Sequence, residues 1–172
     1  MNGSPPRSVV VTGHRPQHLP RECIPWIRTT LTECLASIEQ NGIEAVSGMA
    51  LGVDQWFAEA AFTAGLPVHA AVPFVGQELV WKKDDQERYW GIIAKCRTVT
   101  VLHNTRPIDR GHAARLLHAR NTWMAKRASL AIAVWSGKDG GTAHCVSELV
   151  SRNVPLLVLD PLTKNYRTIP AR

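Results

Sequence analysis

Six short apolar runs alternate along the chain with segments whose apolar residues recur at helical spacing. The runs expected to form strands are residues 8–12, 43–47, 67–72, 98–102, 129–135 and 155–159. The helices between them are expected to begin near Ile24, Val53, Asp84, Ala113 and Thr142. Alternating strands and helices favour a parallel sheet, because each parallel strand needs a crossover connection to reach the next. The pattern predicts an α/β fold, a Rossmann-like three-layer sandwich with a mostly parallel sheet.

Length and composition fit one folded domain. The chain has 172 residues, of which 45% are hydrophobic, and this is enough to bury a core. No internal repeat, low-complexity tract or long linker divides the sequence. We therefore expect residues 1–172 to form a single domain, with the core at about residues 8–160 and an irregular C-terminal tail.

Charge and cysteine content bear on partners and location. Lys and Arg number 20 and Asp and Glu 14, so the net charge is +6, which suits an anionic partner as well as simple solubility. Of the four cysteines, Cys23, Cys34 and Cys96 are expected on helices, and none of the four, Cys145 included, has metal-ligand spacing. The sequence shows no signal peptide and no run of roughly 18 apolar residues. We expect a cytoplasmic protein with no metal, cofactor or membrane partner.

The loops that follow the strands contain the unusual residues. In open α/β sheets, ligands bind beyond the carboxyl ends of the strands. The loops expected at that edge are residues 12–16, 47–54, 73–74 and 136–142. In the last of these, Gly140 and Gly141 would let the backbone approach a ligand, and Thr142 would cap a helix whose free amides attract phosphate. The alternative for this loop is a tight turn without a ligand.

The other loops offer further polar groups. Gly48 and Gly52 precede a helix without completing a dinucleotide or P-loop motif, and Asp54 could accept from a ribose hydroxyl or favour the helix dipole. In the first loop, Arg15 offers a planar fork for phosphate oxygens, beside Gly13 and His14. Trp135, at the end of a strand, could stack on a base or pack within the protein.

Several of these loops match a known family pattern. Residues 47–54 (SGMALGVD) resemble the Ser-Gly-x-Ala-x-Gly-Ile-Asp motif of the DNA-processing protein A family. Residues 12–15 (TGHR), Pro73-Phe74 with Gln77 and Trp81, and Arg120-Asn121 with Met124 are similar to the YpsA-type pattern. On these motifs the chain resembles the YpsA-type branch of the SLOG superfamily from about residue 9 to residue 159. The resemblance implies a Rossmann-like domain with a nucleotide-type ligand.

The same superfamily includes the lonely-guy phosphoribohydrolases. Residues 118–124 (HARNTWM) resemble their His-x-Arg-x-x-x-Met helix, and Gly141-Thr142 matches the Gly-Thr pair of their second motif. The catalytic glutamate of those enzymes would fall at Cys145, and Glu148 lies three residues further on. Because a thiol cannot replace the carboxylate, we do not expect a standard phosphoribohydrolase.

The leading hypothesis is that the chain binds or senses a nucleotide or nucleotide-derived ligand through these loops. A nucleotide N-glycosidase, with Glu148 or Asp54 as its carboxylate, is the first alternative, and single-stranded DNA binding is the second. A homo-oligomer is also expected, because related domains often pair. The residues expected to bind the ligand are Gly13, His14, Arg15, Ser47, Gly48, Met49, Ala50, Gly52, Asp54, Pro73, Phe74, Arg120, Asn121, Gly140, Gly141 and Thr142.

Overall fold

A computed structural model describes residues 7–38 and 42–171 of the chain. Its strands form one sheet in the order β4-β3-β2-β1-β5-β6-β7, and all neighbours are parallel except β6 and β7. The strands are β1 (Arg7–Gly13), β2 (Ile43–Ser47), β3 (Val68–Val72), β4 (Thr98–Val101), β5 (Leu130–Val134), β6 (Leu156–Asp160) and β7 (Asn165–Ile169). The predicted mostly parallel sheet is confirmed.

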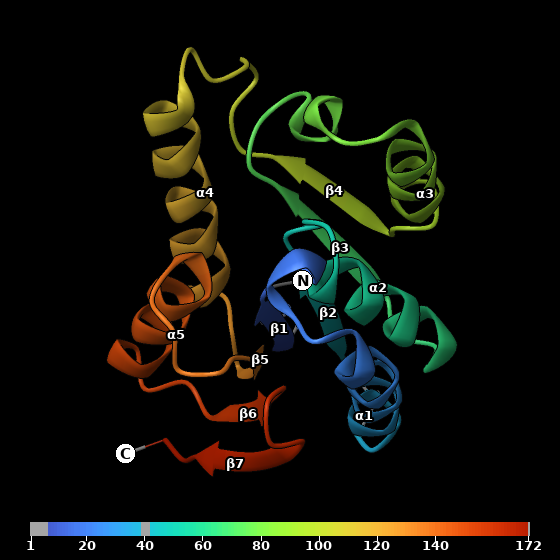
Figure 1. The fold of residues 1–172 in the computed structure, drawn as a ribbon, viewed down its shortest axis with the longest axis vertical. Coiled ribbons are helices and arrows are strands. Elements are labelled where there is room, and N and C mark those ends of the chain that lie inside the picture. The colour runs from blue at the N-terminus through green and yellow to red at the C-terminus, as the bar shows by residue number, and fades with distance from the viewer. Residues whose placement is uncertain (1–6, 39–41, 172) are drawn as a thin grey trace, which may run out of the picture.

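Helices cover both faces of this sheet (Figure 1). The α-helices are α1 (Ile24–Ala36), α2 (Val53–Thr63), α3 (Lys83–Ile93), α4 (Arg110–Ala125) and α5 (Gly141–Ser151), and the short 3-10 helices are η1 (Pro16–His18), η2 (Arg21–Cys23) and η3 (Gln77–Val80). One apolar core lies under α1, α2 and α3, and a second lies under α4 and α5. The strands read as continuous apolar runs because both of their faces are buried in this way. The expected three-layer α/β sandwich is confirmed.

The C-terminal tail was predicted to be irregular, and this prediction is wrong. Residues Asn165–Ile169 form β7, which pairs antiparallel with β6 after a turn in which the amide of Lys164 donates to the carbonyl oxygen of Asp160. Most of β7 is exposed, so its sequence has no apolar run to mark it as a strand. The polar composition of the tail therefore concealed a strand.

Several helix boundaries also differ from the predictions. α1 ends at Ala36, before the expected end at Asn41-Gly42. Asn41 itself lies outside the described residues. α4 begins at Arg110, because the side chain of Asp109 accepts from the amide of His112 and caps the helix. Cys23 and Cys96 lie outside the α-helices expected to carry them, Cys23 in η2 and Cys96 beyond the end of α3.

The strand order changes direction beside β1, and this positions the site. From β1 the chain adds β2, β3 and β4 on one side, and then returns to place β5 and β6 on the other side. The loops that leave β1 and β5 therefore diverge to opposite faces of the sheet and leave a crevice between their carboxyl ends. Within residues 7–38 and 42–171, no helix is long and apolar enough to span a membrane.

Candidate functional site

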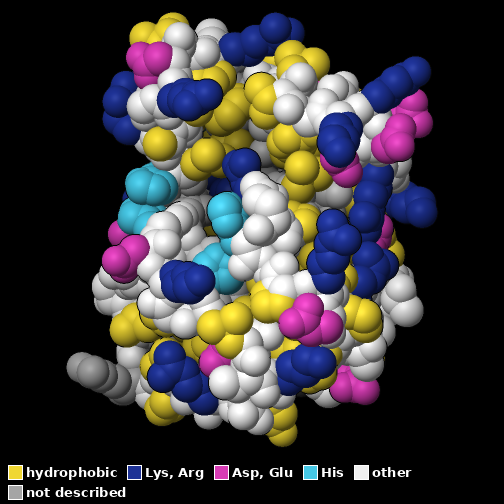
Figure 2. Space-filling view, in the orientation of Figure 1, with side chains coloured by type: hydrophobic (Ala, Val, Ile, Leu, Met, Phe, Trp, Pro, Cys, Tyr) yellow, Lys and Arg dark blue, Asp and Glu magenta, His cyan; other side chains and the backbone are white. Residues whose placement is uncertain are grey.

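A cavity of about 810 Å³ lies at this change of strand direction. Its walls come from the loop after β1, the loop between β5 and α5, and the inner face of α4. Histidine side chains gather beside a hollow on the face shown in Figure 2. The cavity brings together ten of the residues expected to bind the ligand: Gly13, His14, Arg15, Ala50, Asp54, Arg120, Asn121, Gly140, Gly141 and Thr142.

The other expected residues do not line this cavity: they are Ser47, Gly48, Met49, Gly52, Pro73 and Phe74. The loop after β2 is instead folded on itself. The hydroxyl of Ser47 donates to the carbonyl oxygen of Asp54 at 2.8 Å and accepts from the amide of Met49 at 3.2 Å. Met49 is fully buried with a φ of 58°, and Phe74 is also buried. The loop after β2 is therefore held by its own hydrogen bonds and by burial, and these six residues do not form the cavity wall.

Gly48 has a steric role that its motif did not reveal. A Cβ placed on Gly48 would overlap Nη1 of Arg120. The same Nη1 donates a hydrogen bond to the carbonyl oxygen of Gly48. Arg120 therefore crosses the backbone of the loop at a place where only glycine leaves room.

Replacing Gly48 with alanine is expected to displace Arg120 and to destabilise the fold by about 1–3 kcal/mol, the usual cost of overpacking a buried site. Gly91→Ala is the matched control, because a Cβ at Gly91 meets nothing within 4 Å. Urea denaturation of both variants measures the difference. Equal stability of the two variants would show that Arg120 does not need the space at Gly48.

Arg120 is the centre of a buried polar network. Its Nη1 lies 3.8 Å from Oδ2 of Asp54, and its Nε donates to Oδ1 of Asn121 at 3.0 Å. The amide of Ala50 also donates to Asp54 Oδ2. Burial raises the pKa of the Asp54 carboxyl, and the charge of Arg120 acts in the opposite direction. The Asp54 carboxyl is thus engaged inside the protein, and Asp54, Arg120 and Asn121 all line the cavity.

Asn121 connects this network to the start of α5. Its Nδ2 donates to the carbonyl oxygen of Gly141 at 3.2 Å. Gly140, not Thr142, stands at the N-cap position, with a φ of 135°, and no side chain caps the helix. The expectation that Thr142 caps α5 is wrong, because the helix begins one residue before it at Gly141. The uncapped first turn leaves its backbone amides without partners inside the helix, at the wall of the cavity.

Basic side chains surround the same opening. Arg15, His18 and Lys138 line the cavity together with His14. Burial lowers the pKa of His14, and the nearby His18 and Lys138 lower it further, so the imidazole is held toward its neutral form. His18 and Lys138 were not predicted as site residues, although Lys138 lies inside the glycine loop that the sequence singled out.

Two histidines form a stacked pair at the side of the cavity. The rings of His118, on α4, and His144, on α5, are nearly parallel, with centroids 4.1 Å apart. His118 lines the cavity, and His144, which stacks on it, does not. Burial and the neighbouring His144 lower the pKa of His118. The two histidines lie on different helices and meet only because α4 packs on α5. Their separation in the sequence therefore could not predict the pair.

Of the residues considered for catalysis, Asp54 lines the cavity, whereas Cys145 and Glu148 do not. Cys145 is fully buried, and burial raises the pKa of its thiol to about 11. Glu148 accepts from Nη2 of Arg152 at 3.0 Å and is not among the residues that line the cavity. The indole of Trp135 donates to the carbonyl oxygen of Lys138 and braces the loop. Across the described ranges, no group of three or more His, Cys, Asp or Glu side chains could hold a metal ion.

Solved structures share this fold at low sequence identity. DNA processing protein A from Streptococcus pneumoniae aligns with a TM-score of 0.63 and 18% identity, over 91% of this chain and 53% of that one. DNA processing protein A from Helicobacter pylori, described with a single-stranded DNA binding mode, aligns with a TM-score of 0.64 and 20% identity, over 90% and 66%. The chain thus spans between half and two thirds of these two proteins.

A third solved structure is covered more fully. The molybdenum cofactor carrier protein from Chlamydomonas reinhardtii aligns with a TM-score of 0.54 and 14% identity, over 92% of this chain and 80% of that one. No curated protein matches the sequence. The sequence model of YpsA, the YspA SLOG family, matches residues 9–153, which is most of the chain. The chain therefore belongs to the YspA SLOG family.

Proposed function

We propose that the chain binds or senses a nucleotide or a nucleotide-derived ligand in the cavity at the carboxyl ends of β1 and β5. The observation that carries this proposal is the uncapped start of α5, which lines the same cavity as Arg15 and Lys138. Free amides, the positive end of a helix dipole and two cationic side chains together favour a phosphate group. The volume of about 810 Å³ lies within the range of small-molecule sites.

The apolar part of the cavity lining suits the rest of such a ligand. Leu19, Pro20, Ala114 and Leu117 present apolar surface to the cavity, and His118 adds a ring to it. A base could pack on this wall while the phosphate lies at α5. Apolar walls with a few convergent polar groups are typical of ligand sites in proteins.

The geometry favours binding over cleavage of a glycosidic bond. Such cleavage needs a carboxylate beside the reacting carbon. Glu148 is paired with Arg152 away from the cavity wall, and Asp54 is buried against Arg120 and the amide of Ala50. The carboxylates considered for the reaction are thus engaged with the protein itself.

The test is a calorimetric titration of the purified protein with a panel of nucleoside mono-, di- and triphosphates. Each mixture is then incubated and its nucleotides are analysed by chromatography. Saturable binding with unchanged nucleotides supports the proposal, and release of free base would establish the enzyme instead. A single-stranded oligonucleotide is titrated at several salt concentrations in parallel. If only the oligonucleotide binds, with steep salt dependence, nucleic acid is the ligand.

Arg15→Ala is expected to weaken binding of the nucleotide by about ten- to a hundredfold, because a charge-assisted contact contributes roughly 1.5–3 kcal/mol. Arg167→Ala is the control, since Arg167 is an exposed arginine on β7 that does not line the cavity. Calorimetry compares the two variants. Wild-type affinity in Arg15→Ala would exclude the β1 loop from the phosphate site.

A further inference from the structure

We propose that the stacked pair of His118 and His144 takes up a proton from the solvent when a phosphate binds at the start of α5, so that ligand affinity rises as the pH falls through the neutral range. This inference rests on the proposed function, because the phosphate is the charge to which the pair responds. Imidazole is the side chain whose charge ordinarily changes near neutral pH. The rings are nearly parallel and 4.1 Å apart, so the pair accepts one positive charge, because two imidazolium ions at that distance repel each other.

Both histidines lie one helical turn from the contact that joins α4 to the start of α5. That contact is the hydrogen bond from Nδ2 of Asn121 to the carbonyl oxygen of Gly141. His118 precedes Asn121 by three residues on α4, and His144 follows Gly141 by three residues on α5. Side chains three residues apart on a helix have their Cβ atoms about 5–6 Å from each other. The pair therefore lies close to the position proposed for the phosphate, in the cavity that His118 lines.

The two rings have different surroundings, and this difference assigns the proton to His118. Nδ1 of His144 is buried and has no hydrogen-bond partner in the described part of the chain. A proton on that nitrogen would bury an unpaired N–H group, which costs free energy. His118 is exposed and lines the cavity, so its imidazolium form can be hydrated and can face a bound phosphate. His118 therefore holds the proton, with the neutral ring of His144 stacked on it.

Without a ligand, the surroundings favour the neutral pair. Burial and the neighbouring His144 lower the pKa of His118. His144 also lies near the start of α5, where the positive end of the helix dipole disfavours a cation. A bound phosphate brings negative charge to the same helix end and offsets this effect, so the pKa of His118 is higher in the complex than in the free protein. The affinity gained by protonation is fully present below the pKa of the free protein and is lost as the pH rises through the pKa of the complex.

Charged groups surround the pair on both helices. On α4, Arg115 lies three residues before His118. On α5, Glu148 lies four residues after His144, and it accepts a hydrogen bond from Nη2 of Arg152. The carboxylate nearest to His144 along its own helix is therefore already paired.

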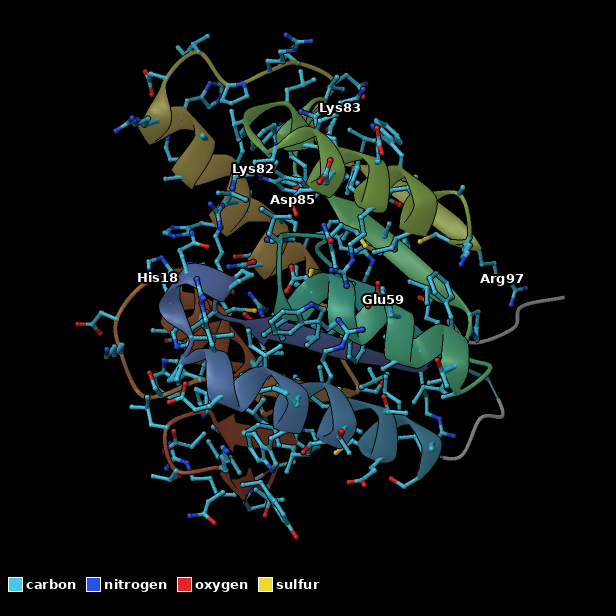
Figure 3. All side chains as sticks on the ribbon, turned by 45° about the vertical axis from the view of Figure 1, so that its right-hand side comes forward. His18, Glu59, Lys82, Lys83, Asp85 and Arg97 are labelled. Carbon is cyan, nitrogen blue, oxygen red and sulfur yellow. The ribbon has the colours of Figure 1, made fainter. Side chains whose placement is uncertain are left out.

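The loops of the cavity contribute further charges. Figure 3 shows His18 at one end of the sheet and Arg97, which precedes β4, at the other end. The titratable residues that these loops add to the cavity lining are His14, Arg15, His18, Lys138 and Asp139. The remaining charged residues of the lining, Asp54 and Arg120, form a buried ion pair with each other. Cationic side chains thus outnumber carboxylates in the lining, and a phosphate supplies the negative charge that a protonated His118 requires.

His14 also lines the cavity, but its contacts oppose protonation. Its Nε2 accepts a hydrogen bond from the backbone amide of Ser136 at 3.4 Å, and only an unprotonated nitrogen can accept. Burial lowers the pKa of His14, and the nearby His18 and Lys138 lower it further. Protonation of His14 would also remove a contact between the loops that follow β1 and β5. The variants His118→Gln and His14→Gln therefore separate the two histidines as sources of a pH effect.

The test measures proton uptake when adenosine 5′-monophosphate binds to the full chain at about pH 7. Calorimetric titrations in two buffers of different ionisation enthalpy give the number of protons, because the buffer releases each proton that the complex takes up. We expect an uptake of roughly half a proton per ligand in the wild type, since the complex is partly protonated at this pH. His118→Gln should lose most of this uptake. His103→Gln is the matched control and should retain it, because His103 does not line the cavity.

A second variant separates the charge effect from contact with the ligand. His144 does not line the cavity, so His144→Gln leaves the ligand contacts in place. An NMR titration of the imidazole protons of His118 should show a higher midpoint pH in the free His144→Gln protein than in the free wild type, because the neighbouring ring no longer lowers the pKa of His118. In the wild type, saturation with adenosine 5′-monophosphate should also move this midpoint to higher pH.

The outcomes distinguish this inference from the proposed function. Nucleotide binding without proton uptake, an uptake that persists in His118→Gln, or a His118 midpoint that is the same with and without the nucleotide would each overturn the inference and leave the proposed function standing. An uptake lost in His14→Gln and retained in His118→Gln would assign the proton to His14 and overturn the role of the stacked pair. Absence of nucleotide binding would overturn both.

Discussion

Gly141→Val is expected to reduce nucleotide affinity by at least about a hundredfold while the fold remains intact, a loss equivalent to about two charge-assisted hydrogen bonds. Gly141 is the first residue of α5 and lines the cavity. A Cβ there would meet no protein atom within 4 Å, and the backbone is not in the left-handed region, so the protein itself can accept a side chain. The added methyl groups would instead occupy the space in which we place the phosphate. Because the phosphate would be displaced, it would lose its hydrogen bonds from the backbone amides of α5.

The control for this prediction is Gly91→Val. A Cβ at Gly91 would also meet no neighbour within 4 Å, and Gly91 lies on α3, away from the cavity wall. Calorimetry gives the affinity of each variant, and thermal unfolding shows whether each is folded. A folded Gly141→Val protein that binds the nucleotide as the wild type does would remove the start of α5 from the site.

Replacing Arg120 with methionine is expected to lower the free energy of unfolding by about 3–5 kcal/mol, the range found when one partner of a buried ion pair is removed. The side chains of Arg120 and Asp54 are only 7% and 8% exposed. Without the guanidinium, the carboxylate of Asp54 keeps its bond from the amide of Ala50 but loses its buried countercharge. The carbonyl oxygen of Gly48 also loses its donor.

The pH dependence of this variant distinguishes lost charge from lost packing. Burial raises the pKa of Asp54 above its ordinary value of 3.8, and removal of Arg120 removes an opposing influence. A carboxyl whose folded pKa is raised loses stability as the pH rises from the unfolded pKa through the folded pKa. The deficit of Arg120→Met should therefore shrink as the pH is lowered from about 7.5 toward about 5.

Urea denaturation at both pH values measures this change, and Asp54→Asn in the Arg120→Met background is the matched comparison. The double variant has no carboxylate to bury, so it should recover part of the stability at the higher pH and should lose most of the pH dependence. A deficit that is the same at both pH values would contradict a buried, uncompensated Asp54 charge.

The sequence predicted the layers of the fold because burial on both faces leaves a readable pattern. Runs such as residues 43–47 and 130–134 are largely apolar, since helices cover both sides of each strand. β7 was missed because it is largely exposed and has no core face to fill. The start of α5 was placed within one residue, but its cap was misassigned, because Gly140 takes a conformation that composition alone does not report.

Candidate site residues could be predicted from the sequence where they lie in loops that follow strands. Residues that reach the cavity only through the packing of distant segments could not be predicted. Gly13 and Gly141, which line the cavity, were proposed from the rule that ligands bind at the carboxyl ends of strands. Gly48 belongs to the same kind of loop, yet it serves Arg120, which lies 72 residues later in the chain. Leu162 reaches the cavity from beyond β6, and no local signal marks a residue of that kind.

The cavity beside β1 and β5 is proposed to bind a nucleotide with its phosphate at the start of α5. An NMR titration of the isotopically labelled protein with the tightest-binding nucleotide of the panel tests this placement most directly, because each backbone amide reports on its own surroundings. We predict the largest shifts at the amides of Gly141 and Thr142, with smaller shifts around Arg15. Saturable shifts that leave these amides unmoved, or no shifts with any nucleotide, would contradict the proposed binding site.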